Sequence, residues 1–179
     1  SVIIRYEWPK GTPPPPESVV RKEPGRILFA WSAAAGPLPA TEHLDGLSRA
    51  AAAGFLPFLP ERDVLPHASC SGLTAALEAA RRGGTAISVL HILCHGVAAG
   101  STFALAFDPE GPGDAMARVD AALLRQLLAP YASMVRMVVL MACDSGNSGA
   151  LGNQLGSIAQ TLHRAGFAGD LAAELGGGG

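Results

Sequence analysis

Two side chains that could perform nucleophilic chemistry follow apolar runs in this sequence. Cys143 closes the apolar run 138–143, and His95 comes directly after the apolar run 87–94. A cysteine thiolate is a strong nucleophile, and an imidazole beside it can take the thiol proton and later deliver it to a leaving group. If the fold brings them together, Cys143 and His95 form a thiol–imidazole pair suited to acyl transfer.

The two apolar runs must position these side chains. Each run has the length and the Val, Ile and Leu content of a strand buried on both faces of a parallel sheet, and small and polar residues after Cys143 indicate a turn. In open α/β sheets the carboxyl ends of parallel strands meet at one edge, where ligands and catalytic groups gather. We therefore expect His95 and Cys143 to lie at the same edge.

The residues around the pair suggest how a thiolate could form and what it could attack. His95 could act as the base, and the N-terminus of a helix predicted over 151–165 would further favour the thiolate. The lack of a side chain at Gly96 lets a backbone amide approach an oxyanion closely, so we assign the oxyanion hole to the amides of Gly96 and Cys143. Asp144 could contact a substrate amine or cap the following turn.

Composition limits the class of protein. The 179 residues are 49% hydrophobic, with a formal net charge of −2 and only 6% aromatic residues, which does not favour a nucleic acid or an anionic membrane as partner. The three cysteines lack CxxC spacing, which argues against a disulfide framework or a structural zinc site. With no signal-like or membrane-spanning run, the sequence predicts a cytoplasmic protein, and its Ala and Gly richness suggests a high-GC genome.

Strands and helices alternate along the chain, which predicts an α/β fold with a mostly parallel sheet covered on both faces, in three layers. We expect an N-terminal strand and proline-rich arm over 1–25, one domain over 26–169, and a flexible tail over 170–179. Strands are expected at 26–31, 63–65, 87–94, 102–107 and 138–143, and helices at 41–53, 72–82 (capped by Ser71), 119–129 and 151–165.

The segments 90–96 and 138–146 together resemble the CHAT domain, a caspase-like, separase-related group of clan CD cysteine peptidases, and the similarity extends over about 26–166. The resemblance implies a caspase-like sandwich, with His95 as the catalytic histidine, Cys143 as the nucleophile, and the Gly96 and Cys143 amides as the oxyanion hole. It also implies an endopeptidase that cuts a protein substrate, such as a regulated effector in bacterial defence or cell death, often coupled to sensor or repeat modules.

Two features depart from the related families. Metacaspases carry an acidic residue two positions before the cysteine, which helps to select basic P1 side chains, whereas this chain has Met141 there. Met141 is thus a candidate substrate contact that does not define a P1 preference. Caspase-like folds also continue further past the helix that follows the cysteine. We therefore expect this chain to be the large-subunit portion, with a small-subunit-like C-terminal half as a separate, cleaved or missing chain.

Neither a metal nor a cofactor is expected. His91 and His95 have the spacing of a helical zinc pair, but in a strand their α-carbons would lie about 13 Å apart, too far for one metal ion. His91 is instead expected to be a buried, hydrogen-bonded core residue, and Cys94 a packed thiol. No nucleotide-binding glycine motif occurs.

Two other functions compete with the peptidase hypothesis. A catalytically silent CHAT-like module could serve as a protein-interaction scaffold, although such a scaffold needs neither His95 nor Cys143. A small-molecule thiol hydrolase or transferase would require a closed apolar pocket instead of an open peptide groove.

Overall fold

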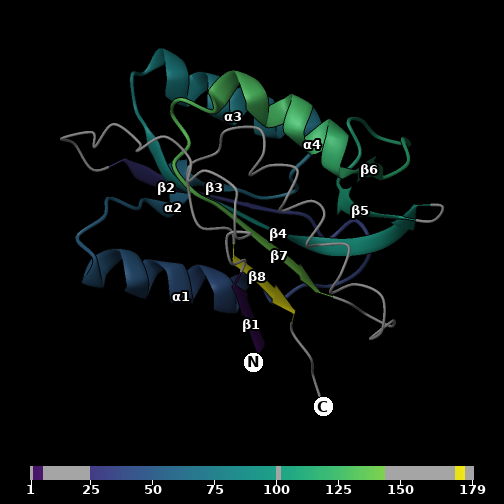
Figure 1. Ribbon diagram of the computed structural model, residues 1–179, viewed down its shortest axis with the longest axis horizontal. Helices are drawn as coiled ribbons and strands as arrows, with labels where there is room; N and C mark the ends of the chain where they lie inside the picture. The colour runs from purple at the N-terminus through teal and green to yellow at the C-terminus, as the bar shows by residue number, and fades with distance from the viewer. Residues whose placement is uncertain (1, 6–24, 100–101, 144–171, 176–179) are drawn as a thin grey trace, which may run out of the picture.

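The computed structural model describes residues 2–5, 25–99, 102–143 and 172–175, with side chains described over 25–99 and 103–142. Within these ranges the chain forms a mixed α/β fold around a curled sheet (Figure 1). The strands are β1 (Val2–Arg5), β2 (Arg26–Trp31), β3 (Val64–Leu65), β4 (Ile87–Ala99), β5 (Thr102–Phe107), β6 (Ala117–Val119), β7 (Val138–Cys143) and β8 (Ala172–Leu175). The helices are α1 (Ala40–Ala53), α2 (Pro60–Asp63), α3 (Cys70–Arg82) and α4 (Ala121–Leu128), and a 3-10 turn, η1 (Ala129–Tyr131), follows α4.

The sheet has the strand order β1-β8-β7-β4-β2-β3, with β5 and β6 branching from β4. The pairs β2/β3, β2/β4, β4/β7 and β7/β8 are parallel, whereas β1/β8, β4/β5 and β5/β6 are antiparallel. Helices α3 and α4 lie on one side of the sheet and α1 lies on the other (Figure 1). The predicted α/β class, with a mostly parallel sheet between helices as in a caspase-like sandwich, is confirmed.

Strand β4 is central because its two faces meet different layers. Alternate positions of a strand point to opposite faces. Leu90, Ile92 and Cys94 belong to the main hydrophobic core, together with buried leucines of α3 and α4. His91 lies on the opposite face, where its ring contacts that of His43 on α1. His95, four residues further along, shares that face, so the hydrophobic pattern of β4 decides which layer receives the histidines.

Several element boundaries differ from the sequence-based expectation. Strand β4 does not stop at Cys94 but continues to Ala99, because its last four residues pair with β5. Val119 belongs to β6, and α4 begins after Asp120, whose carboxylate accepts the Leu123 amide at 2.8 Å. Propensity alone does not separate these segments, since strand pairing depends on partners distant in sequence.

The cap of α3 and the end of the chain also differ from expectation. Ser69, not Ser71, caps α3 by accepting the Gly72 amide at 3.1 Å, and Ser71 instead binds the carboxylate of Glu110 through its amide and hydroxyl. The range Ala172–Leu175, expected in a flexible tail, forms β8 between β1 and β7. The helix expected at 151–165 lies outside the described residues.

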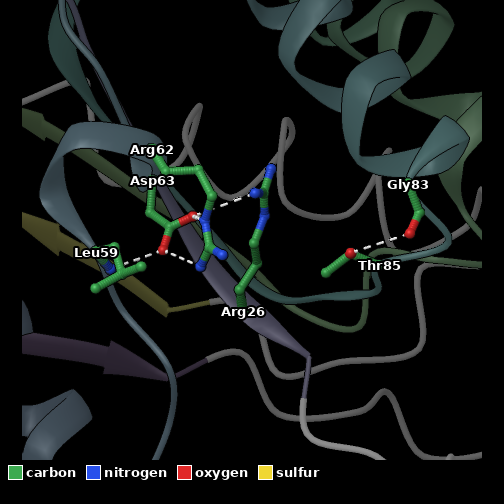
Figure 2. A network of polar contacts seen from close by, with 6 residues as sticks. All are labelled: Arg26, Leu59, Arg62, Asp63, Gly83 and Thr85. Atoms are coloured by element: carbon green, nitrogen blue, oxygen red, sulfur yellow. Dashed lines mark hydrogen bonds and ion pairs between the residues drawn. The ribbon is translucent and has the colours of Figure 1, made fainter.

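A buried carboxylate ties the start of β2 to α2 (Figure 2). Asp63 is fully buried and accepts two hydrogen bonds from Arg62 and one from the Leu59 amide, each at 2.8 Å. Arg26, at the start of β2, lies 3.4 Å from the same carboxylate. Burial by itself would raise the pKa of this carboxyl, but its hydrogen bonds and the two guanidinium charges outweigh burial and lower the pKa.

We predict that Asp63→Ala lowers the free energy of unfolding by about 3–5 kcal/mol, because it leaves the largely buried Arg26 without its partner. Since the folded-state pKa is depressed, this carboxylate stabilises the fold above its unfolded pKa of about 3.9, and the contribution is lost as pH falls through the folded pKa. Urea unfolding at pH 7 and at pH 3 measures both effects. Glu61→Ala, an exposed carboxylate in the same helix, is the matched control, and an equal loss in both variants would contradict the prediction.

Candidate active site

The parallel ladder between β4 and β7 brings the two predicted catalytic positions side by side. His95 and Cys143 form the last register pair of this ladder, following Leu93↔Met141 and Cys94↔Ala142. Neighbouring strands are about 4.8 Å apart, so the two backbone positions are immediate neighbours at the carboxyl edge of the sheet. This is the juxtaposition a thiol–imidazole pair requires.

His95 is held by a loop that the sequence did not single out. The imidazole is 5% exposed, and its Nε2 lies 3.1 Å from the carbonyl oxygen of Pro37, in the loop between β2 and α1. A carbonyl only accepts hydrogen bonds, so Nε2 must carry the hydrogen and donate it. In the neutral ring the lone pair is then on Nδ1, and this is the nitrogen that can take a proton.

The loop that supplies this carbonyl is itself fixed to β4. The Ser32 amide donates to the carbonyl of Leu93 at 3.0 Å, and the Ser32 hydroxyl accepts the Ala34 amide at 3.3 Å. Gly36 then turns the chain with φ +140°, a backbone conformation that side chains with a Cβ rarely adopt. A Cβ at this position would lie 3.5 Å from Nε2 of His95. The tight turn at Gly36 thus places the Pro37 carbonyl against the imidazole.

His91 is on the same face of β4 but in a different environment. It is 7% exposed, and its ring lies edge-on to Phe29 with centroids 5.2 Å apart and 5.8 Å from that of His43. Burial, and secondarily the charge of His43, lowers the pKa of His91 to about 4. The expectation of a buried residue is correct, but that of a hydrogen-bonded one is wrong for Nε2, which has no hydrogen-bond partner among the described residues. His91 is therefore neutral near pH 7.

The other predicted residues occupy different positions. Cys94 is 1% exposed in the main core, as expected of a packed thiol. Gly96 pairs with Leu105 of β5, one residue beyond His95 and at the point where β4 passes from the parallel to the antiparallel part of the sheet. Met141 is half-buried on β7. Asp144 lies outside the described residues.

The described residues show neither a group of metal ligands nor a membrane-spanning helix. Among the side chains that the structure covers, no three His, Cys, Asp or Glu residues are arranged to hold a metal ion. Over the same ranges, no helix is long and apolar enough to cross a membrane.

Comparison with known proteins identifies the family. Residues 11–173, which make up most of the chain, match the family model of the CHAT domain. The chain belongs to the CHAT family. CHAT domains are related to the caspase-like cysteine peptidases of clan CD. No curated protein matches this CHAT domain, and no solved structure does.

The buried His91 predicts a pH dependence of stability. Its folded pKa of about 4 lies below an unfolded value of about 6.5, so the unfolded chain binds a proton that the folded chain does not. The full free energy of unfolding is therefore present above about pH 6.5. It falls as pH drops toward 4, by about 3 kcal/mol in total. Urea unfolding across this range should show the slope, and His91→Phe should reduce it. The control is His67→Gln, which changes an exposed histidine. If the pH slope stayed unchanged in His91→Phe, or disappeared in His67→Gln, the slope would not come from His91.

The conformation of Gly36 predicts opposite effects of the same substitution at two glycines. Gly36→Ala should lower the free energy of unfolding by about 1–3 kcal/mol, because alanine is strained at φ +140°. Gly46→Ala, inside α1 with nothing near its Cβ, should raise it by about 0.5–1 kcal/mol. Denaturant unfolding measures both, and NMR of the His95 imidazole N–H should show loss of the Pro37 hydrogen bond in Gly36→Ala alone. A stabilising Gly36→Ala would overturn this account.

Proposed function

We propose that this CHAT domain is a cysteine endopeptidase in which Cys143 is the nucleophile and His95 the general acid–base. The observation that carries the proposal is the register pair His95↔Cys143 at the carboxyl edge of β4 and β7. The hydrogen bond from Nε2 of His95 to Pro37 supports it, because it fixes the tautomer that leaves Nδ1 as the proton acceptor. Family membership supports the same chemistry.

The reaction would proceed through a thioester. The Cys143 thiolate attacks the scissile carbonyl carbon, and the amides of Gly96 and Cys143 stabilise the resulting oxyanion. His95, protonated at Nδ1, donates that proton to the leaving amine as the C–N bond breaks. His95 then takes a proton from water, which attacks the thioester and releases the carboxylate product and the thiol. Met141 and Asp144, which flank the nucleophile in sequence, are proposed as substrate contacts.

The biological setting is proposed from the family. A protein substrate, a small-subunit-like C-terminal half and a sensor or repeat module are the partners we expect of a regulated effector in bacterial defence or cell death, acting in the cytoplasm. No metal ion or organic cofactor takes part in the proposed steps.

A catalytically silent protein-interaction module is the alternative. It is disfavoured by the ordered support of His95, since a scaffold does not require a buried imidazole tied to a loop carbonyl. The peptidase hypothesis predicts an unusually reactive Cys143 thiol, whereas the scaffold hypothesis does not.

We predict that Cys143 reacts with iodoacetamide with an apparent pKa at least about one unit below the free-thiol value of about 8.5. His95→Ala should reduce the rate at pH 6.5 by about tenfold or more, because the imidazolium that stabilises the thiolate is removed. Peptide mass spectrometry separates the three cysteines. Cys70, whose thiol pKa is raised by burial and by Glu110, and the buried Cys94 are internal references.

Equal reactivity at Cys143 and Cys70, or no effect of His95→Ala, would refute the proposed dyad. Cleavage of a denatured-protein library by the native chain, and its loss in Cys143→Ala, would establish hydrolysis. A reactive Cys143 that cleaves nothing, either alone or with the small-subunit-like half supplied, would leave a thiol site but contradict the endopeptidase.

A further inference from the structure

A second group of side chains lies at the end of β2, the strand that pairs with β4, and we call Trp31, His67 and Asp108 the Trp31 cluster. Two backbone hydrogen bonds assemble it: the Ala68 amide donates to the carbonyl of Trp31 at 2.9 Å, and the Asp108 amide donates to the carbonyl of Ala68 at 2.9 Å. The ends of β2 and β5 and the segment after β3 therefore meet at one place.

Contacts between the side chains follow from this backbone arrangement. The rings of Trp31 and His67 have centroids 5.1 Å apart and are tilted by 51°. Nδ1 of His67 lies 3.8 Å from Oδ1 of Asp108. His67 has a φ of +53° although its side chain is 73% exposed. Burial does not account for this conformation, which is uncommon outside glycine and is concentrated at functional sites.

Within the part of the chain that the structure describes, the carboxylate of Asp108 lacks hydrogen-bond partners that would compensate for its burial. Its side chain is only 17% exposed, and Oδ2 is buried without a hydrogen-bond partner among the described residues. The 3.8 Å separation from His67 is too long for a hydrogen bond. Shielding a carboxylate from water without hydrogen bonds is costly, and an incoming ammonium or guanidinium group would meet that need better than His67 does. The ring of Trp31, which contacts His67, offers an aromatic surface for the aliphatic stem of such a group.

The cluster has a defined position relative to the dyad. Across the sheet the order is β7, β4, β2, β3, so Cys143 and the cluster lie on opposite sides of His95. The Ser32 amide binds the carbonyl of Leu93, which places the end of β2 beside β4 two residues before His95. In peptide cleavage the histidine must reach the leaving amine, whereas the sulfur holds the acyl side. In the proposed reaction, the amine side of the substrate would therefore extend past His95 toward the cluster.

We propose that the Trp31 cluster is a subsite for a lysine or arginine side chain of the substrate, in the residue that follows the scissile bond. Asp108 pairs with the cation, Trp31 packs against its stem, and His67 moves aside to open the carboxylate. The assignment of this side chain to the amine side rests on the proposed peptidase function, whereas binding of the cation at the cluster does not.

The test measures binding without catalysis, in the full chain carrying Cys143→Ala. The sequence has two tryptophans, so Trp8→Phe leaves Trp31 as the fluorescent reporter. The probes are the tripeptide amides Arg-Ala-Ala and norleucine-Ala-Ala, which imitate the amine product, and acetyl-Ala-Ala-Arg, which imitates the acyl product. We expect Arg-Ala-Ala amide to quench Trp31 and to bind about tenfold or more tightly than the norleucine peptide, as one charge-assisted contact provides.

Asp108→Asn should remove this preference, whereas Asp114→Asn, an exposed carboxylate in the same loop, should retain it. Equal binding of the arginine and norleucine peptides, or an unchanged preference in Asp108→Asn with circular dichroism showing a native fold, would overturn the subsite. Tighter binding of acetyl-Ala-Ala-Arg would overturn the assignment to the amine side. Asp108-dependent binding in a protein whose Cys143 proves unreactive would sustain the cation site and refute the peptidase.

Discussion

The parallel pairing of β4 with β2 on one side and β7 on the other is the constraint on which the rest of the structure depends. Leu90 and Ile92 are buried against α3 and α4, and this burial sets which face of β4 receives each side chain. Because strand positions alternate, a slip of one residue would turn His95 into the apolar core and move Leu90 and Ile92 to the face covered by α1. The register that opposes His95 and Cys143 is therefore maintained by hydrophobic burial on the face away from the site.

The two histidines of β4 show how position within one strand decides chemistry. His91, beneath α1, lies between Phe29 and His43, and burial lowers its pKa so that it is neutral. His95 is also buried, but it is the last residue of β4 that pairs with β7, where the loop before α1 approaches and the Pro37 carbonyl fixes its Nε2. The imidazole of His91 therefore packs as a neutral core side chain, whereas that of His95 is held in one tautomer.

Strand β2 connects the stability of the fold with the geometry of the site. Its first residue, Arg26, is anchored by the buried Asp63, and its last, Trp31, leads into the loop that holds His95 and belongs to the proposed cation subsite. The same strand end thus supports the imidazole on one side and the Trp31 cluster on the other. One strand therefore joins the polar network at its start to the side chains at its end.

The sequence by itself determined the elements whose signal is local. The apolar runs predicted β2 and β7 with their observed bounds. The runs 87–94 and 138–143 also predicted that His95 and Cys143 meet at one edge. Only the tertiary structure decided the contacts and strand lengths that depend on residues distant in sequence. A backbone carbonyl such as that of Pro37 has no side-chain signature, and the continuation of β4 to Ala99 exists because β5 pairs with it. The Trp31 cluster likewise joins three segments through backbone hydrogen bonds, which no local pattern encodes.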